Sequence, residues 1–215
     1  MISWREDFRG PTKGAMVVAL TLREDNLAPT AGDLNEAPAR NPSHMAFLRR
    51  RALSRRAVAA RLGVSPASVE IGHAASGAPM VLAPTGALRI GALRISVSGR
   101  ENFCAVAMAE TPIGVDIEPL RAIEPPWSLL HPNERKALET PTSEARLDAF
   151  LRLWTAKEAY LKALGVGFAR DPAKIAIDLD FAIFDEEATP VIAARGWRRF
   201  LLNGEEFIAA CVVLG

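Results

Sequence analysis

The sequence has few of the residues that build covalent cross-links or histidine-based sites. It contains two cysteines and three histidines in 215 residues. Cys104 and Cys211 lie in apolar, strand-like runs and cannot make a disulfide framework, so they indicate buried free thiols and a reducing cytoplasm. His44, His73 and His131 stand apart in the sequence, which argues against the Asp- and His-rich site of a two-metal hydrolase.

An excess of one charge and long apolar runs are also missing. Lys and Arg total 26 against 25 Asp and Glu, so the net charge of +1 argues against a general nucleic-acid binder. No apolar run reaches the length of a membrane span, and residues 1–7 lack the order of a signal peptide. With 49% hydrophobic and 24% charged residues, the composition is typical of a globular protein, which we expect in the cytoplasm without a membrane partner.

The first informative motif, at residues 113–118 (Ile-Gly-Val-Asp-Ile-Glu), places two carboxylates at the end of an apolar run. Side chains at i and i+2 of a strand point to the same side of a sheet. Asp116 and Glu118 can therefore share one cation.

The second motif, at residues 154–162 (Trp-Thr-Ala-Lys-Glu-Ala-Tyr-Leu-Lys), has a helical pattern. Glu158 and Lys162 lie one turn apart, so they share a face of the helix. Three carboxylates and a lysine suit a hard divalent cation that carries a phosphate group. The two motifs together predict metal-assisted chemistry on a phosphate compound.

Both motifs resemble those of the longer, Sfp-like 4′-phosphopantetheinyl transferases. That family has an (I/V)-G-(I/V)-D-x-E strand followed, at a spacing similar to the one here, by (F/W)-(S/T/C)-x-K-E-(A/S)-x-x-K. The resemblance covers residues 47–167. It implies Mg²⁺-dependent transfer of the phosphopantetheine arm of coenzyme A to a serine of an apo acyl or peptidyl carrier protein. Mn²⁺ is the alternative metal.

The resemblance also implies an α+β fold, in which two α/β lobes are related by a pseudo-twofold axis and the cofactor occupies the cleft between them. The sequence supports this, because residues 61–64 (Arg-Leu-Gly-Val) are echoed by residues 163–166 (Ala-Leu-Gly-Val) at the ends of two predicted helices. We expect an N-terminal lobe over 1–110 and a C-terminal lobe with the metal site over 111–215. One chain would supply both walls of the cleft, which predicts a monomer. Chance similarity of element order is the alternative.

Local patterns predict the individual elements. Helices are expected at about 44–62 and 143–164, each closed by a glycine, and a further helix is expected to start near His131. Strands are expected at 69–71, 92–97, 103–109, 113–118, 175–177, 181–184, 191–193, 197–202 and 207–214, with a turn over 98–101. A loop-like segment is expected over 26–43.

The resemblance assigns roles to the residues of the second lobe. Asp116, Glu118 and Glu158 match the family's metal ligands. Glu158 is our candidate for the base that takes the serine proton, with Glu118 as the fallback. Lys162 would neutralise the pyrophosphate, and Asp116 would contact the cofactor as well as the metal. Lys157 points about 100° away from Glu158 around the helix, so we expect it to contact a different part of the cofactor.

In the first lobe, residues 47–55 resemble the family's F-L-x-x-R-x-L-x-R helix. This maps two cofactor-binding arginines onto Arg51 and Arg55, which share one helix face. Ser96 is the third expected cofactor contact of this lobe.

Two departures from the family pattern concern the far end of the cofactor. Ala78 and Val97 stand where we place the family's lysine and histidine, which hold the 3′-phosphate of coenzyme A. Arg94 or Arg100 would substitute for them, or the donor differs from ordinary coenzyme A. The alternatives to an active transferase are therefore a non-catalytic or altered-donor member of the fold, and another metal-dependent phosphate enzyme.

Overall fold

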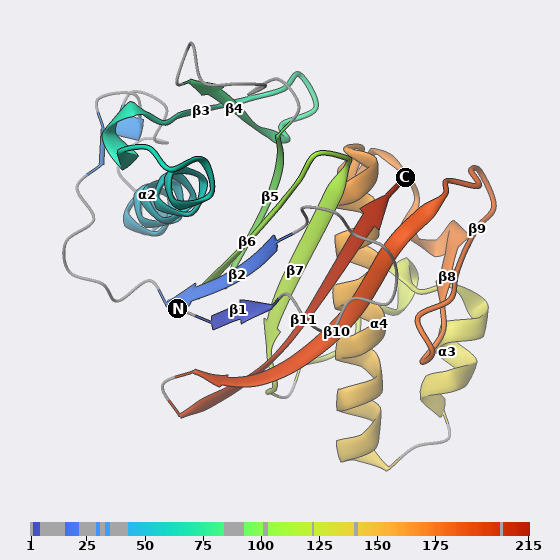
Figure 1. The fold of residues 1–215 in the computed structure, drawn as a ribbon. Coiled ribbons are helices and arrows are strands. Elements are labelled where there is room, and N and C mark those ends of the chain that lie inside the picture. Colours follow the sequence, from blue (N-terminus) through green and yellow to red (C-terminus); the bar gives the residue numbers. More distant parts are fainter. Residues whose placement is uncertain are drawn as a thin grey trace.

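The computed structural model describes residues 2–4, 16–21, 29–30, 33–34, 43–83, 93–100, 103–121, 123–139, 142–202 and 204–215. It has a mixed α+β fold of helices packed on antiparallel sheets, which confirms the α+β part of the predicted fold (Figure 1). The first half contains β1 (Ile2–Trp4), β2 (Met16–Thr21), α2 (Ser43–Leu62), β3 (Glu70–His73), β4 (Pro79–Ala83), β5 (Arg94–Arg100) and β6 (Phe103–Ala109). The second half contains β7 (Ile113–Pro119), α3 (Pro132–Glu139), α4 (Ser143–Leu164), β8 (Ile175–Ile177), β9 (Ile183–Asp185), β10 (Ile192–Leu202) and β11 (Glu205–Leu214). Short 3₁₀ turns lie at Pro66–Ser68, Trp127–Leu129, Gly167–Ala169 and Pro172–Lys174.

The two halves use the same order of pairing. The first sheet runs β1-β2-β6-β5-β4-β3, and the second runs β10-β11-β7. In each half a strand precedes the long helix, and that strand pairs with the last strand of the half: β2 with β6, and β7 with β11. In each half the last two strands form an antiparallel hairpin, β5 with β6 and β10 with β11.

Alternating side chains of β6, β7 and β11 divide the core into three clusters. One face of β6 packs with β7 and β11 in the cluster between the two sheets, through Phe103, Ala105, Ala107, Ala109, Ile113, Val115, Ile117, Phe207, Ala209, Cys211 and Val213. The other face of β6 packs under α2 through Cys104, Val106 and Met108. The other face of β11 packs against α4 through Ile208, Ala210, Val212 and Leu214. Because side chains alternate along a strand, the remaining residues of β7 face α4, and these include Asp116 and Glu118.

Both long helices end as the sequence predicts. Gly63 and Gly165 follow them with φ values of +70° and +71°, the left-handed conformation that favours glycine. The hydroxyl of Thr142 caps the start of α4 by accepting a hydrogen bond from the N–H of Ala145. These local signals explain why the predicted helix bounds agree with the structure to within a residue.

Two expected elements differ from the structure, and a third lies mostly outside the described residues. Residues 98–100 belong to β5, so the predicted turn over 98–101 is wrong at these positions. The predicted strands at 191–193 and 197–202 form one strand, β10, with an irregularity between Ile192 and Ala194. Most of the segment 26–43 lies outside the described residues. Among the helices of the described part of the chain, none is long and apolar enough to cross a membrane.

Candidate active site

The glycine of the first motif sets the distance between β7 and α4. A Cβ atom on Gly114 would lie 1.8 Å from the carbonyl oxygen of Ala159 and 2.5 Å from the nitrogen of Ala163. Both neighbours are backbone atoms, so no side-chain movement would relieve this contact. Only glycine lets α4 lie this close, and the close approach brings Glu158 and Lys162 of the helix to the carboxylates of β7.

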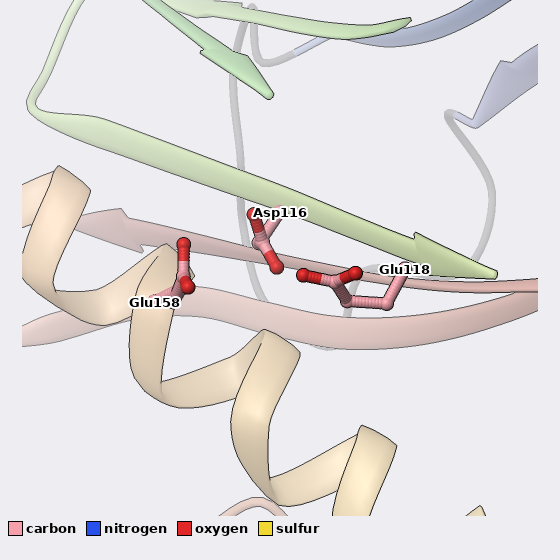
Figure 2. A group of neighbouring side chains, drawn as sticks. All are labelled: Asp116, Glu118 and Glu158. Carbon is pink, nitrogen blue, oxygen red and sulfur yellow. The ribbon is translucent and has the colours of Figure 1, made fainter. Parts of the chain in front are cut away.

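Three carboxylates converge between β7 and α4. Each of Asp116, Glu118 and Glu158 offers an oxygen, and these oxygens all lie within 4.8 Å of one another. Figure 2 shows the two side chains of β7 directed toward the one from α4. Their side chains are 1%, 7% and 12% exposed, respectively, so Glu158 is the most accessible of the three.

The oxygen Oδ2 of Asp116 is buried and has no hydrogen-bond partner among the residues that the structure describes. A buried acceptor without a donor is costly, and a cation would relieve that cost. The donor set consists of oxygens only, which suits Mg²⁺ or Mn²⁺. The site therefore fits a hard divalent cation.

Two basic side chains lie against the three carboxylates. The Nζ of Lys162 lies 2.6 Å from Oδ1 of Asp116 and 3.4 Å from Oε2 of Glu158. The Nε of Arg100 donates to both oxygens of Glu118 at 2.8 Å, and its Nη2 lies 3.9 Å from Oε1 of Glu158. With all five groups ionised, the cluster keeps one net negative charge. A divalent cation would make it positive, and such a cluster attracts phosphate.

The electrostatics of the cluster favour the binding of a cation. Burial, followed by repulsion from Asp116, raises the pKa of Glu158 to about 7. Burial also raises the pKa of Glu118, in spite of its hydrogen bond with Arg100. Burial alone would lower the pKa of Lys162, but the charges of Asp116 and Glu158 outweigh it and raise that pKa.

A cleft of about 340 Å³ extends from this cluster to the first half of the chain. Its walls come from α2, β3, β4 with the turn before it, β5 and α4. The lining residues are Phe47, Arg50, Arg51, Ser54, Ile71, His73, Gly77, Pro79, Val97, Ser98, Gly99, Arg100 and Lys162. Four of these lining residues are Arg or Lys, which makes the cleft suitable for an anion.

Comparison with known proteins agrees with this geometry. Residues 112–212 match the family model described as the 4′-phosphopantetheinyl transferase superfamily. Over 221 aligned residues, the chain is 29% identical to the 4′-phosphopantetheinyl transferase HetI of Nostoc sp., a match covering 99% of this chain and 86% of the relative. Residues 112–212 therefore carry the sequence pattern of the 4′-phosphopantetheinyl transferase superfamily.

Other relatives of this superfamily match shorter stretches. A 4′-phosphopantetheinyl transferase of Bacillus subtilis is 33% identical over 119 residues, which cover 54% of this chain and 50% of the relative. An L-aminoadipate-semialdehyde dehydrogenase-phosphopantetheinyl transferase of Schizosaccharomyces pombe is 42% identical over 73 residues, covering 30% of this chain and 27% of the relative. These matches confirm the predicted family and the predicted enzyme class, a transferase.

Lys157, an expected cofactor contact, lies in the core beside α3. The side chain of Lys157 is 0% exposed, and its Nζ lies 2.6 Å from Oε2 of Glu134. It also donates to the carbonyl oxygens of Leu129 and Pro172. All three donors of the ammonium group are therefore used on the side of α4 that faces α3. These contacts favour a structural role, and the cofactor contact of Lys157 stays a prediction.

The two arginines predicted on α2 differ in position. Arg51 lines the cleft, with its Nε 3.3 Å from Oδ1 of Asp33 and its Nη2 donating to the carbonyl oxygen of Ile71. Arg55 is buried, forms an ion pair with Asp33 and is absent from the lining of the cleft. Burial lowers the pKa of Arg55 although Asp33 opposes this shift. The cofactor contacts expected for Arg51 and Arg55 both stay predictions.

The polar residues of β5 form one row toward β7. Ser96 accepts a hydrogen bond from the N–H of Val115 at 3.1 Å, Ser98 donates to Oδ1 of Asp116 at 2.6 Å, and Arg100 binds Glu118. Ser96 is buried and holds β5 against β7, so its contact with the cofactor stays a prediction. The contacts that Ser98 and Arg100 make with the carboxylates were missed. The alternation of polar residues with Ile95, Val97 and Gly99 along β5 was the available signal.

The two departures from the family pattern lie beside a second, smaller cavity. It has a volume of about 240 Å³, and its lining includes Ala78, Ser96 and Val97. Val97 also packs against the hydrophobic cluster under α2. Of the proposed substitutes, Arg100 binds Glu118, and Arg94 is absent from the lining of both cavities.

Proposed function

We propose that this protein transfers the 4′-phosphopantetheine arm of coenzyme A to a serine of an apo acyl or peptidyl carrier protein. The observation that carries the proposal is the convergence of Asp116, Glu118 and Glu158 at the end of a basic cleft, in a chain that matches the model of this superfamily. The cleft between the two halves is the proposed site of coenzyme A.

Asp116, Glu118 and Glu158 would hold the metal, which we propose to be Mg²⁺, with Mn²⁺ as the alternative. When bound, such a cation supplies positive charge to the pyrophosphate oxygens of the donor. Lys162 contributes a second positive charge at the same place, because its Nζ already lies against Asp116 and Glu158. Ser98 holds the carboxylate of Asp116 in position through its hydroxyl.

Glu158 is the proposed base. It is the most exposed carboxylate of the three and comes from α4, at the edge of the cluster, where a hydroxyl of the carrier can reach it. Glu158 would take up the proton of the serine hydroxyl. The serine oxygen then attacks the phosphorus, and 3′,5′-ADP leaves with the electrons of the broken P–O bond.

The repeated element order supports the proposal that the chain arose by duplication, with lobes over 1–110 and 111–215. Both lobes contribute residues to the lining of the cleft, Arg51 from α2 and Lys162 from α4. A single chain supplies both walls, so we propose that the protein acts as a monomer, in the cytoplasm.

A non-catalytic or altered-donor member of the fold is the second candidate. It is favoured by Ala78, because alanine cannot donate to a phosphate. The complete carboxylate set favours an active transferase, since a protein that only binds a ligand has no need of a buried acidic cluster.

The intact mass of apo carrier proteins tests the proposal. An acyl carrier and a peptidyl carrier are each incubated with the protein, coenzyme A and Mg²⁺, and the modified residue is located by peptide mapping. We expect a phosphopantetheine mass gain on one serine, which is lost in EDTA and with Glu158→Gln. No gain on any carrier, with Mg²⁺ bound, would contradict the transferase and favour the second candidate.

A further inference from the structure

Among the residues that the structure describes, no acidic side chain pairs with Arg50, unlike the other arginines and the lysine of the cleft. Arg51 is paired with Asp33, Arg100 with Glu118 and Lys162 with Asp116. Within the described part of the chain, the side chain of Arg50 makes no hydrogen bond or ion pair, although it is half-buried. A guanidinium without an internal partner is available to a ligand and loses no existing ion pair when the ligand binds.

Gly99 makes room for the side chain of Arg50. A Cβ atom on Gly99 would lie 2.6 Å from Cδ and 3.3 Å from Cγ of Arg50. The stem of Arg50 therefore crosses from α2 over β5 at the one place where β5 has no side chain. Gly99, Arg50 and Lys162 all line the cleft.

We infer that Arg50 binds the ribose phosphate of coenzyme A, and that Gly99 is required for this contact. This inference rests on the proposed function, which identifies the donor. Coenzyme A carries one phosphate besides its pyrophosphate, at the 3′ position of its ribose. Lys162 and the three carboxylates account for the pyrophosphate end, and Arg50 is the remaining basic group of the cleft that forms no ion pair within the described part of the chain. The chain thereby supplies from α2 the charge that Ala78 and Val97 do not provide.

Arginine suits this role because its fork of donors binds two phosphate oxygens at once. A side chain at position 99 would occupy the path of Arg50 and displace its guanidinium. Position 99 is therefore a determinant of donor specificity, although glycine itself makes no side-chain contact with the donor.

The test compares coenzyme A with dephospho-coenzyme A, which lacks this one phosphate. The dissociation constants of both compounds are measured by calorimetry with Mg²⁺, together with kcat/KM for transfer to an apo carrier. We expect the wild type to bind coenzyme A about 10- to 100-fold more tightly than dephospho-coenzyme A, the range of one charge-assisted contact. Arg50→Gln should remove that preference by weakening coenzyme A alone. Arg49→Gln, an exposed neighbour on α2, is the matched control and should keep it.

Gly99→Ala is the second variant. Its Cβ meets a flexible part of Arg50, so the protein should fold, and its thermal melting checks this. We expect the same selective loss of coenzyme A binding. The inference is overturned if Arg50→Gln weakens both compounds equally or neither, and its Gly99 part is overturned if Gly99→Ala binds like the wild type.

The proposed function fails in a different way. If no carrier gains mass while the wild type binds coenzyme A and prefers it through Arg50, transfer is wrong and the Arg50 contact stands.

Discussion

The two halves of the molecule share an order of elements but carry different charges on the strand and the long helix that correspond. The second half brings two carboxylates on β7 against a third on α4. The first half has no acidic residue on β2, and its helix α2 presents arginines. The carboxylates of β7 and α4 thus suit a cation, and the arginines of α2 suit an anion. The same arrangement of strand and helix can therefore hold either the carboxylates that bind a metal or the arginines that bind a phosphate.

The helix α4 repeats this contrast on its own surface. Lys162 is 29% exposed and lies against the carboxylates at the cleft, whereas Lys157 is fully buried beside Glu134. Two lysines of one motif therefore have different surroundings, one at the site and one in the core.

The largest expected effect on the rate of transfer comes from removing a carboxylate of the cluster formed by Asp116, Glu118 and Glu158. We predict that Asp116→Asn lowers kcat/KM for transfer by about a thousandfold or more, because it removes a charged ligand from the metal site. Glu144→Gln, on the exposed first turn of α4, is the control and should stay near the wild-type rate. A rate for Asp116→Asn within tenfold of the wild type would show that the carboxylate cluster is not the reaction centre.

Lys157→Met sharpens the contrast between the two lysines. It leaves the carboxylate of Glu134 buried without its cation, and we expect the free energy of unfolding to fall by about 3–5 kcal/mol. Lys162→Met should change stability much less and should instead slow transfer. Urea denaturation and the transfer assay measure the two effects. The reverse pattern, a stable but inactive Lys157→Met, would support a cofactor role for Lys157.

Gly114→Ala tests whether the close contact of β7 with α4 is specific to the second half. The new Cβ would meet backbone atoms of α4, so we expect a loss of about 3 kcal/mol of stability by chemical denaturation. Gly99→Ala is the matched control in the first half, where the nearest neighbour is a flexible side chain. Equal losses in the two variants would remove the distinction.

The smallest predicted effect is a pH dependence of the free energy of unfolding that arises from Glu158 of the carboxylate cluster. Burial and Asp116 raise the pKa of Glu158 to about 7 in the folded protein, above the value of an unfolded glutamate. Between about pH 4.5 and 7 the folded state therefore binds more protons than the unfolded chain, so this group makes stability fall as pH rises. For an isolated group the fall amounts to at most about 3 kcal/mol.

Urea denaturation in EDTA at several pH values measures this fall. Glu158→Gln cannot titrate, so the difference in stability between the wild type and this variant should change with pH across that window. Saturating Mg²⁺ should abolish the change, since the metal takes the place of the proton. A difference that stays constant without metal would contradict the raised pKa.

The sequence predicts what depends on neighbours along the chain. Glycines 63 and 165, the cap at Thr142 and the spacing of Asp116 with Glu118 are local, so the helix bounds and the acidic strand follow from them. The environment of Lys157 depends on Glu134 of another helix, and no local pattern reveals that pairing.

The same limit applies to β5. The motif search singled out Ser96 and Val97, whereas the contacts of Ser98 and Gly99 arise because β7 and α2 pack on the two sides of that strand. Such contacts depend on how distant elements pack, which no short motif contains.

We propose that the carboxylate cluster catalyses phosphopantetheine transfer with a bound metal. This proposal is tested most directly by stripping the protein of metal and following the intact mass of an apo carrier with coenzyme A as Mg²⁺ is restored. We expect no transfer without metal. As Mg²⁺ is added, the wild-type rate should return and saturate, whereas Glu158→Gln should remain inactive. Full transfer by the stripped protein, or a wild-type rate for Glu158→Gln, would contradict it.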